Sequence, residues 1–213
     1  SRAVEMALLS RLRLVQGPPG TDKTQTVTAM IEAMDRAFGR LFRFLDKSSL
    51  SSNTLVIFTS DNGAFGGVSD SRPLRASKGY LYEGGIRVPL MVRWPGVTEP
   101  GSVTTDMAMN LDFAETFLEI AGQPIPPDMQ GKSLIPVLQQ KTPSTWRDSV
   151  YYHYYEYPGA HSVRRHLGVR TDRYKLIHFY NLDEWELYDL KKDPNEMKSV
   201  YSDPAHADVL KMM

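Results

Sequence analysis

A helical pattern of apolar residues that leads directly into a strand pattern limits the possible folds of this chain more than any other feature. Between Val27 and Leu45, apolar residues recur every three or four positions, which predicts a helix with one buried face. After a polar turn, the run Thr54–Ser60 is dominated by β-branched and large apolar residues, which predicts a strand buried on both faces of a parallel sheet. A helix that is followed by a buried strand favours α/β architecture.

The segments that follow extend this pattern to the middle of the chain. A long polar, glycine-containing stretch over 66–85 precedes Val88–Arg93, which we expect to be a second strand. Loops of that length inside compact domains are usually functional or disordered. We expect a further helix over Asp112–Ala121, with Phe113 and Phe117 on its apolar side.

The character of the sequence changes after Trp146. Short aromatic runs, separated by turn residues, lie over 150–157, 167–170, 174–180 and 185–190. This spacing predicts an antiparallel sheet in a subdomain of its own. The final stretch is typical of the start of a helix that Ser202 or Asp203 caps.

The composition excludes several classes of function. Lysine and arginine together number 25, as do aspartate and glutamate, so the formal net charge is zero and no overall basic field exists to bind nucleic acid or an anionic membrane. The apolar runs are of strand length, far shorter than the roughly 20 residues of a membrane-spanning helix. The chain contains no cysteine, which rules out disulfides, thiolate metal sites and cysteine nucleophiles.

The segment Gly17–Thr24 is similar to a phosphate-binding loop that precedes a helix. It departs from the pattern G-x-x-x-x-G-K-[ST] at the sixth position, where Asp22 replaces the glycine that lets backbone N–H groups close around phosphates. A carboxylate at that position would also repel a phosphate. We therefore favour a plain turn and helix start, and we keep a nucleoside-triphosphatase remnant as a minor alternative.

The residues directly after the strand expected over Thr54–Ser60 are candidate cation ligands. Asp61 and Asn62 offer two hard oxygen donors of the kind that calcium and magnesium bind. Ligand sites in parallel sheets lie at the carboxyl ends of strands. The triplet that these residues form with Gly63 is also among the commonest turn sequences. The local pattern by itself leaves a plain turn and a metal site both open.

Several motifs, spread over most of the chain, resemble the sulfatase family. They are the helix of residues 30–45, the strand that ends in Ser60-Asp61-Asn62-Gly63, Lys78 with the segment Glu83-Gly84-Gly85-Ile86-Arg87-Val88-Pro89, Trp94-Pro95-Gly96, and Gly131-Lys132-Ser133-Leu134. The resemblance runs from about residue 28 to about residue 201. It implies an α/β fold: the C-terminal part of an alkaline-phosphatase-like α/β/α sandwich, followed by a small antiparallel-sheet subdomain.

The resemblance also implies roles for particular residues. In that family an aspartate–asparagine pair binds a divalent cation, usually calcium, and a lysine upstream of the Glu-Gly-Gly motif binds the sulfate group. The matching residues are Asp61 and Asn62 as ligands of Ca²⁺, or alternatively Mg²⁺, and Lys78 as the catalytic and sulfate-binding residue. A cation and a fixed ammonium would stabilise the charge that builds up on the oxygens of a sulfate ester. We expect Glu83 and Arg87 to brace the loop.

The nucleophile of the family is missing from this sequence. Sulfatases use a formylglycine made from Cys or Ser in a C/S-x-P-S-R motif, and no segment of the chain has that order. Two protein ligands also fall short of the roughly six to eight oxygens that calcium prefers. We therefore expect a fragment that is inactive alone and whose partner is the missing N-terminal half of the sulfatase domain. The family implies a periplasmic or extracellular location, although the chain begins without a signal peptide.

Residues 151–166 form the candidate segment for substrate recognition. They contain three of the five histidines together with tyrosines and arginines, a mixture that suits a sulfated sugar. A strand with inward-facing tyrosines explains the same pattern equally well. This part of the chain resembles bacterial glycosaminoglycan sulfatases, including those that act on N-acetylglucosamine-6-sulfate. If that resemblance holds, His153, His161 and Arg164 are the first candidates for substrate contacts.

These observations predict three regions: an atypical N-terminal segment over 1–27, the C-terminal part of a sulfatase α/β domain over 28–148, and a sulfatase C-terminal subdomain over 149–213. The expected activity is the hydrolysis of sulfate esters on a sulfated sugar. The main alternative, from another class of protein, is a noncatalytic module that binds sulfated glycans through its aromatic and basic C-terminal segment.

Overall fold

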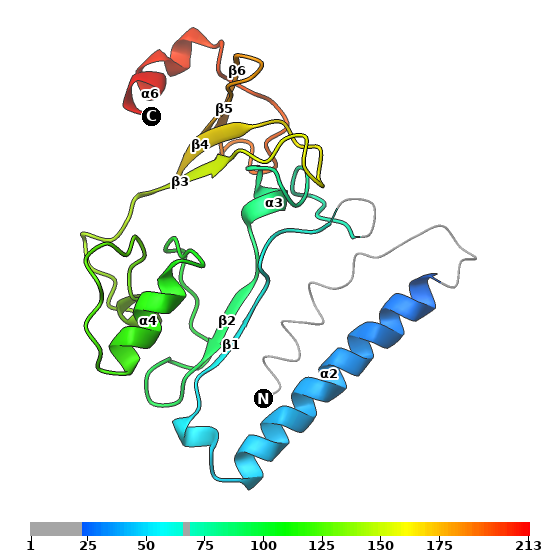
Figure 1. The fold of residues 1–213 in the computed structure, drawn as a ribbon, viewed down its shortest axis with the longest axis vertical. Coiled ribbons are helices and arrows are strands. Elements are labelled where there is room, and N and C mark those ends of the chain that lie inside the picture. Colours follow the sequence, from blue (N-terminus) through cyan, green and yellow to red (C-terminus); the bar gives the residue numbers. More distant parts are fainter. Residues whose placement is uncertain (1–22, 66–68) are drawn as a thin grey trace. The chain divides into compact units, whose positions relative to one another are not determined.

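The computed structural model describes residues 23–65 and 69–213 (Figure 1). The chain divides into two compact units, of which one comprises Ser1–Ile57 with Val92–Val103 and the other Phe58–Met91 with Thr104–Met213. The phosphate-loop-like stretch up to residue 22, and with it most of the region expected over 1–27, lies outside the described residues. Among the described residues, no helix combines the length and the apolar character that crossing a membrane requires.

The first unit contains the long helix α2, which spans Lys23–Lys47 and confirms the helix that the apolar spacing predicts. A 3-10 turn, η1, follows over Ser51–Asn53. Arg93 ties this turn to the helix, because its Nη2 donates to the Ser51 hydroxyl oxygen at 2.5 Å and its guanidinium carbon lies 5.7 Å from the centre of the Phe42 ring.

The strands β1 (Val56–Thr59) and β2 (Leu90–Arg93) lie where the sequence predicts strands, and they pair in a two-stranded sheet. The prediction that β1 is buried on both faces is wrong, because the residues at 56–58 are half-buried and Thr59 is exposed. Within the described part of the chain, β2 is the one strand that pairs with β1. Strand β1 therefore has fewer covering elements than a central strand of a parallel sheet.

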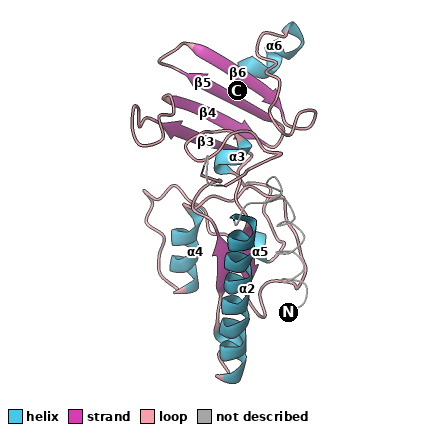
Figure 2. Ribbon diagram, turned by 90° about the vertical axis from the view of Figure 1, so that its right-hand side faces the viewer, coloured by secondary structure: helices cyan, strands magenta, loops and turns pink. Residues whose placement is uncertain are grey.

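The second unit contains a four-stranded antiparallel sheet, as the aromatic runs predict. Its strands, in spatial order, are β3 (Ser149–Tyr154), β4 (His166–Thr171), β5 (Tyr174–Phe179) and β6 (Glu184–Asp189). Figure 2 shows the four strands side by side, with the short helix α3 (Glu83–Ile86) next to the sheet. Burial alternates along β5, so that one face of the sheet packs inward.

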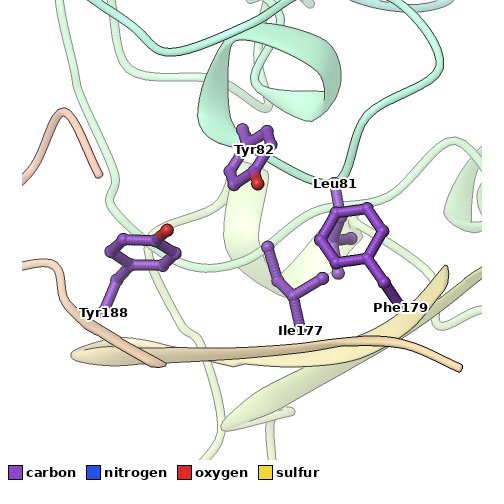
Figure 3. Close-up of a cluster of buried hydrophobic side chains, with 5 residues drawn as sticks. All are labelled: Leu81, Tyr82, Ile177, Phe179 and Tyr188. Atoms are coloured by element: carbon purple, nitrogen blue, oxygen red, sulfur yellow. The ribbon is translucent and has the colours of Figure 1, made fainter. Parts of the chain in front are cut away.

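The core of this unit lies between the sheet and the segment that leads into α3 (Figure 3). Leu81 and Tyr82 of this segment meet Ile177 and Phe179 of β5 and Tyr188 of β6. Each of the five residues is at most 8% exposed. Burying side chains of this size contributes roughly 1.5–3 kcal/mol each. The loop expected over 66–85 is therefore anchored on the sheet at its C-terminal end.

Helix α4 (Asp112–Ile120) confirms the predicted helix, but its buried face is polar. Asp112 and Thr116 are 0% and 1% exposed, whereas Phe117 and Ile120 are 49% and 41% exposed. The side chains of Asp112 and Thr116 accept hydrogen bonds from backbone N–H groups of the loop that leads to the next helix. These bonds satisfy Asp112 and Thr116, whereas Oε2 of the buried Glu115 has no hydrogen-bond partner among the described residues.

Short helical elements complete the second unit. Helix α5 spans Ile135–Leu138. Near the C-terminal end, the 3-10 turn η2 (Pro204–His206) leads into α6 (Ala207–Met212). Of the two expected caps, Asp203 is the residue whose side chain accepts a hydrogen bond from the Ala205 N–H, at 3.0 Å.

Candidate active site

The turn after β1 is held by hydrogen bonds and by close backbone packing. The Ser60 hydroxyl donates to the carbonyl oxygen of Asn62 at 2.8 Å, and the N–H of Gly63 donates to the carbonyl oxygen of Gly85 at 2.8 Å. A Cβ atom at Gly63 would lie 1.9 Å from the carbonyl oxygen of Gly84. This contact admits only glycine, and it places the turn directly against the start of α3.

Asp61 and Asn62 form a pair of oxygen donors that fits a hard cation. The Oδ1 atom of Asn62 is buried and has no hydrogen-bond partner among the described residues. A hydrogen bond from the Asn62 side chain, together with the charge of Lys78, lowers the pKa of Asp61, so that its carboxylate is ionised at neutral pH. Buried polar atoms are normally paired. An unpaired amide oxygen beside a carboxylate is therefore suited to bind calcium or magnesium.

These two residues would supply only part of a coordination shell. In the portion of the chain that the structure describes, no three His, Cys, Asp or Glu side chains gather in a metal-binding arrangement. Calcium takes roughly six to eight oxygen ligands, so other groups would have to complete the site.

Lys78 lies in the loop that packs against the same turn. Its backbone N–H donates to the carbonyl oxygen of Ala64 at 2.9 Å. The residue is half-buried, and its charge acts on the carboxylate of Asp61. The fold therefore brings Asp61, Asn62 and Lys78, the metal and sulfate candidates of the sequence, to one place.

His161 is a direct neighbour of the loop that carries Lys78. Gly79 has a φ of +95°, and a Cβ atom built there would lie 3.5 Å from the Cβ of His161. The ring of His161 also meets the ring of Phe65 edge-on, with 5.8 Å between the ring centres. Of the substrate candidates, His161 is thus joined to the Lys78 loop by direct packing.

The other two substrate candidates lie on β3 and on the β3–β4 connection. His153, an exposed residue of β3, shares a hydrogen bond of 3.2 Å with the Tyr180 hydroxyl and contacts the ring of Tyr155. The guanidinium carbon of Arg164 lies 4.5 Å from the centre of the Tyr157 ring. None of these contacts joins His153 or Arg164 to the turn at Asp61.

A buried ionic group behind the site is missing from the sequence-based candidates. Lys175 is 0% exposed, and its Nζ lies 2.7 Å from Glu83 and 2.6 Å from Glu196, both of which are also buried. The alternation of residues along the strand gives one indication of this buried ionic group. Alternation along β5 puts Lys175 on the same face as Ile177 and Phe179, where a charged side chain needs a partner.

His166 holds the backbone just before α3, and no pattern in the sequence indicates this role. It is fully buried, its Nε2 accepts a hydrogen bond from the Leu81 N–H at 3.1 Å, and its Nδ1 lies 2.7 Å from the carbonyl oxygen of Arg164. An acceptor at Nε2 assigns the proton of the neutral ring to Nδ1. Burial lowers the pKa of His166, His153 acts in the same direction, and the Arg164 carbonyl and Glu186 oppose them.

We expect this histidine to make stability depend on pH in the weakly acidic range. The folded-state pKa of His166 lies below the ordinary value of 6.5, so the unfolded chain binds the proton first as the pH falls. The stabilising contribution of neutral His166 is complete above about pH 6.5 and is lost as the pH falls through the lowered folded-state pKa. Urea unfolding at about pH 7.5 and about pH 5.5 measures this loss.

Two variants show whether His166 is responsible. His166→Gln retains an oxygen that accepts from the Leu81 N–H, so the difference between the two pH values should shrink. His153→Gln removes an exposed histidine and should retain most of the difference. An unchanged pH dependence in His166→Gln contradicts the assignment.

Comparison with known proteins establishes the family. The family model for sulfatases matches residues 13–123, and the model for the C-terminal part of N-sulphoglucosamine sulphohydrolase matches residues 76–213. The chain belongs to the sulfatase family. Its mixed helices and strands, with the small antiparallel sheet, are those of alkaline-phosphatase-like sulfatases.

Three relatives show how much of such a protein the chain represents. An N-acetylglucosamine-6-O-sulfatase of Bacteroides thetaiotaomicron is 47% identical over 84% of this chain and 32% of its own length. A sulfatase of Formosa agariphila is 34% identical over 94% of this chain and 41% of its own length. A solved protein in complex with its substrate D-glucosamine-2-N,6-O-disulfate is 45% identical over 85% of this chain and 37% of its own, with a TM-score of 0.77. The chain spans about a third to two fifths of these relatives.

Proposed function

We propose that this chain is the C-terminal part of a sulfatase that hydrolyses a sulfate ester on a sugar of the N-acetylglucosamine-6-sulfate class. The observation that carries the proposal is the buried Oδ1 of Asn62, which has no hydrogen-bond partner in the described part of the chain. It lies beside the ionised Asp61, on whose carboxylate the charge of Lys78 acts. The names of the relatives support the substrate class, since one is an N-acetylglucosamine-6-O-sulfatase and another has a 6-O-sulfated glucosamine as its substrate.

In this proposal, the carboxylate of Asp61 and the side-chain amide of Asn62 would hold a divalent cation, which is calcium in most sulfatases. The bound cation supplies positive charge next to the oxygens of the ester. Lys78 binds the sulfate group, because its ammonium carries three N–H donors and compensates the charge that develops on the nonbridging oxygens. The charge of Lys78 acts on the carboxylate of Asp61, so its ammonium lies within electrostatic reach of the turn.

The sugar would be bound from the side of the antiparallel sheet. His161 packs against the Lys78 loop and is the first residue that we place at the sugar. Arg164 and His153 lie on the adjoining connection and strand, where their N–H donors suit hydroxyl, carboxylate or sulfate groups of the substrate.

We propose further that this chain does not turn over substrate without the rest of a sulfatase domain. It lacks the formylglycine motif, and it offers two of the roughly six to eight ligands that calcium takes. Leu111, at the start of α4, and Phe117 and Ile120 within it are 46%, 49% and 41% exposed, an apolar surface that a further part of the domain would cover. A periplasmic or extracellular location follows from the same family.

A chimera tests the activity. Residues 28–213 of this chain replace the matching C-terminal part of the Bacteroides thetaiotaomicron relative, which then supplies the formylglycine. We expect the chimera to hydrolyse 6-O-sulfated N-acetylglucosamine, and we expect Lys78→Ala to lower kcat by roughly 10²–10³-fold, because a charge-stabilising donor is lost. Lys211→Ala, which removes an exposed lysine, is the matched control. A folded chimera without turnover contradicts the proposal.

Measurements on the isolated chain distinguish this proposal from the glycan-binding alternative. The proposal requires that a calorimetric titration of the isolated chain shows no tight calcium binding and that sulfate esters are not hydrolysed. Binding of sulfated glycans that survives Asp61→Ala together with Lys78→Ala would favour a noncatalytic glycan-binding module instead.

A further inference from the structure

The segment from Lys78 to Gly85 connects the candidate active site with the four-stranded sheet. Three buried ionisable residues hold its C-terminal half: Glu83 at the start of α3, Lys175 of β5 and Glu196 beyond β6. We infer that Lys175 and Glu196 are positioning residues, which set the place of Lys78 and of the Asp61–Asn62 turn by holding the backbone of residues 81–83 on the sheet. The catalytic consequence of this inference rests on the proposed function.

On the side of the sheet, Lys175 and Glu196 bind the main chain of residues 81–83, and Lys175 also binds the side chain of Glu83. The Nζ of Lys175 donates to the carbonyl oxygen of Leu81 at 3.0 Å and to Oε1 of Glu83 at 2.7 Å. The Oε2 of Glu196 accepts from the backbone N–H of Glu83 at 2.6 Å. Its Oε1 lies 2.6 Å from the Lys175 Nζ, as an ion pair without hydrogen-bond alignment. The sheet therefore fixes the backbone itself.

On the opposite side, the same backbone holds the candidate site. The carbonyl oxygen of Gly85 accepts from the N–H of Gly63, the residue directly after Asn62. The contact between Gly63 and the carbonyl oxygen of Gly84 leaves no space for even a methyl group. A displacement of these two glycines relative to the sheet would therefore move the cation-binding turn with it.

The charges of this group show why Lys175 is its centre. Burial acts to raise the pKa of Glu83, but Lys175, Arg170 and Arg87 outweigh burial, so the pKa is lowered. Arg87 lies 3.8 Å from Glu83, which agrees with the bracing role expected for this pair. For Glu196, burial outweighs Lys175, and the pKa is raised. Without Lys175, two buried carboxyl groups would lie together without the cation between them, which destabilises this arrangement.

Hydrogen exchange on the intact chain tests the structural part of the inference. Glu196→Gln retains an oxygen that accepts from the Glu83 N–H, whereas Glu196→Ala retains none. In Glu196→Ala we expect the amides of residues 83–87 to exchange at least roughly tenfold faster, with the amides of β4 and β5 unchanged. Glu196→Gln should exchange as the unchanged chain does. Unchanged exchange at 83–87 in Glu196→Ala, or a uniform increase over the sheet, overturns the inference.

A second variant covers the case in which Glu196→Ala does not fold. Lys175→Met combined with Glu196→Leu replaces the ion pair by apolar side chains of similar size, an exchange that often preserves stability. The same local increase in exchange over residues 83–87 is expected. If the amides of residues 83–87 exchange as slowly in this variant as in the chain without substitutions, the inference is overturned.

A double-mutant cycle in the chimera tests the catalytic part. Lys175→Met should lower kcat/KM by roughly 100-fold. In a chimera that already carries Lys78→Ala, the same substitution should lower kcat/KM by less than about tenfold, because the effect of Lys175 passes through the position of Lys78. Lys211→Met is the control. If the two losses in kcat/KM multiply in full, the effect of Lys175 does not pass through Lys78, and its role in positioning Lys78 is overturned. A chimera without any turnover contradicts the proposed function, and the exchange experiment then still decides this inference.

Discussion

Asp112→Ala is expected to lower the free energy of unfolding by about 3–5 kcal/mol, because it leaves a buried guanidinium without its partner. Asp112 is 0% exposed and accepts two hydrogen bonds of 2.5 Å from Arg147, whose side chain is 10% exposed. It also accepts from the backbone N–H groups of Met109 and Lys132, at 2.7 Å and 2.9 Å. Urea unfolding of the chain, monitored by circular dichroism, measures the change in the free energy of unfolding.

An exposed pair of the same kind is the matched control. The carboxylate of Asp70 accepts side-chain hydrogen bonds of 2.6–3.0 Å from Arg72, but the side chains of Asp70 and Arg72 are 38% and 84% exposed. Exposed ion pairs contribute little because water and salt screen them. Asp70→Ala should therefore leave the unfolding midpoint nearly unchanged. If Asp70→Ala and Asp112→Ala lower the free energy of unfolding by similar amounts, burial does not determine the contribution of the Asp112–Arg147 pair.

Gly63→Ala is expected to damage the candidate site and the fold together. The added Cβ would lie 1.9 Å from the carbonyl oxygen of Gly84 and 2.8 Å from the Cα of Gly85, and backbone atoms have no rotamer by which to move away. Overpacking of this kind costs roughly 1–3 kcal/mol or more. A misplacement of the turn by about 1 Å can cost about 10²-fold in rate. Urea unfolding of the chain and kcat of the chimera measure the two effects.

Gly39→Ala distinguishes a steric effect at Gly63 from a general effect of replacing glycine. Gly39 lies within α2, and the nearest atom to its added Cβ would be the side-chain Nη1 of Arg43, at 3.4 Å. Alanine at such a helical position should raise stability by roughly 0.5–1 kcal/mol. If Gly63→Ala lowers neither the stability of the chain nor the kcat of the chimera, the turn does not pack against α3 as closely as the structure indicates.

Elements whose signals lie within a short stretch of sequence were predicted well. The apolar spacing of Val27–Leu45 predicts α2, and the aromatic runs predict four antiparallel strands. These predictions succeed because helical and strand periodicity depend on neighbours along the chain. The burial of β1 was not predicted correctly, because burial depends on which elements cover a strand.

Helix α4 shows a second limit of local patterns. Its apolar side chains suggest that Phe113 and Phe117 face the core, but the helix instead buries Asp112 and Thr116. The buried pair is satisfied by Arg147 and by backbone groups beyond the helix. A periodicity argument assigns an apolar side to a helix, whereas hydrogen-bond partners distant in sequence decide which side is covered.

The family resemblance and most of the helices and strands could be predicted from local sequence patterns, which also indicated Asp61, Asn62 and Lys78 as candidates for binding a cation and a sulfate group. The packing of the chain was needed to show that the charge of Lys78 acts on Asp61, and that a lysine and a glutamate more than 90 positions beyond Glu83 hold the loop behind them. The physical reason is that an ion pair has no local signature. A charged residue in a strand looks the same in the sequence whether it faces water or a buried carboxylate, and the register and packing of the sheet decide between the two.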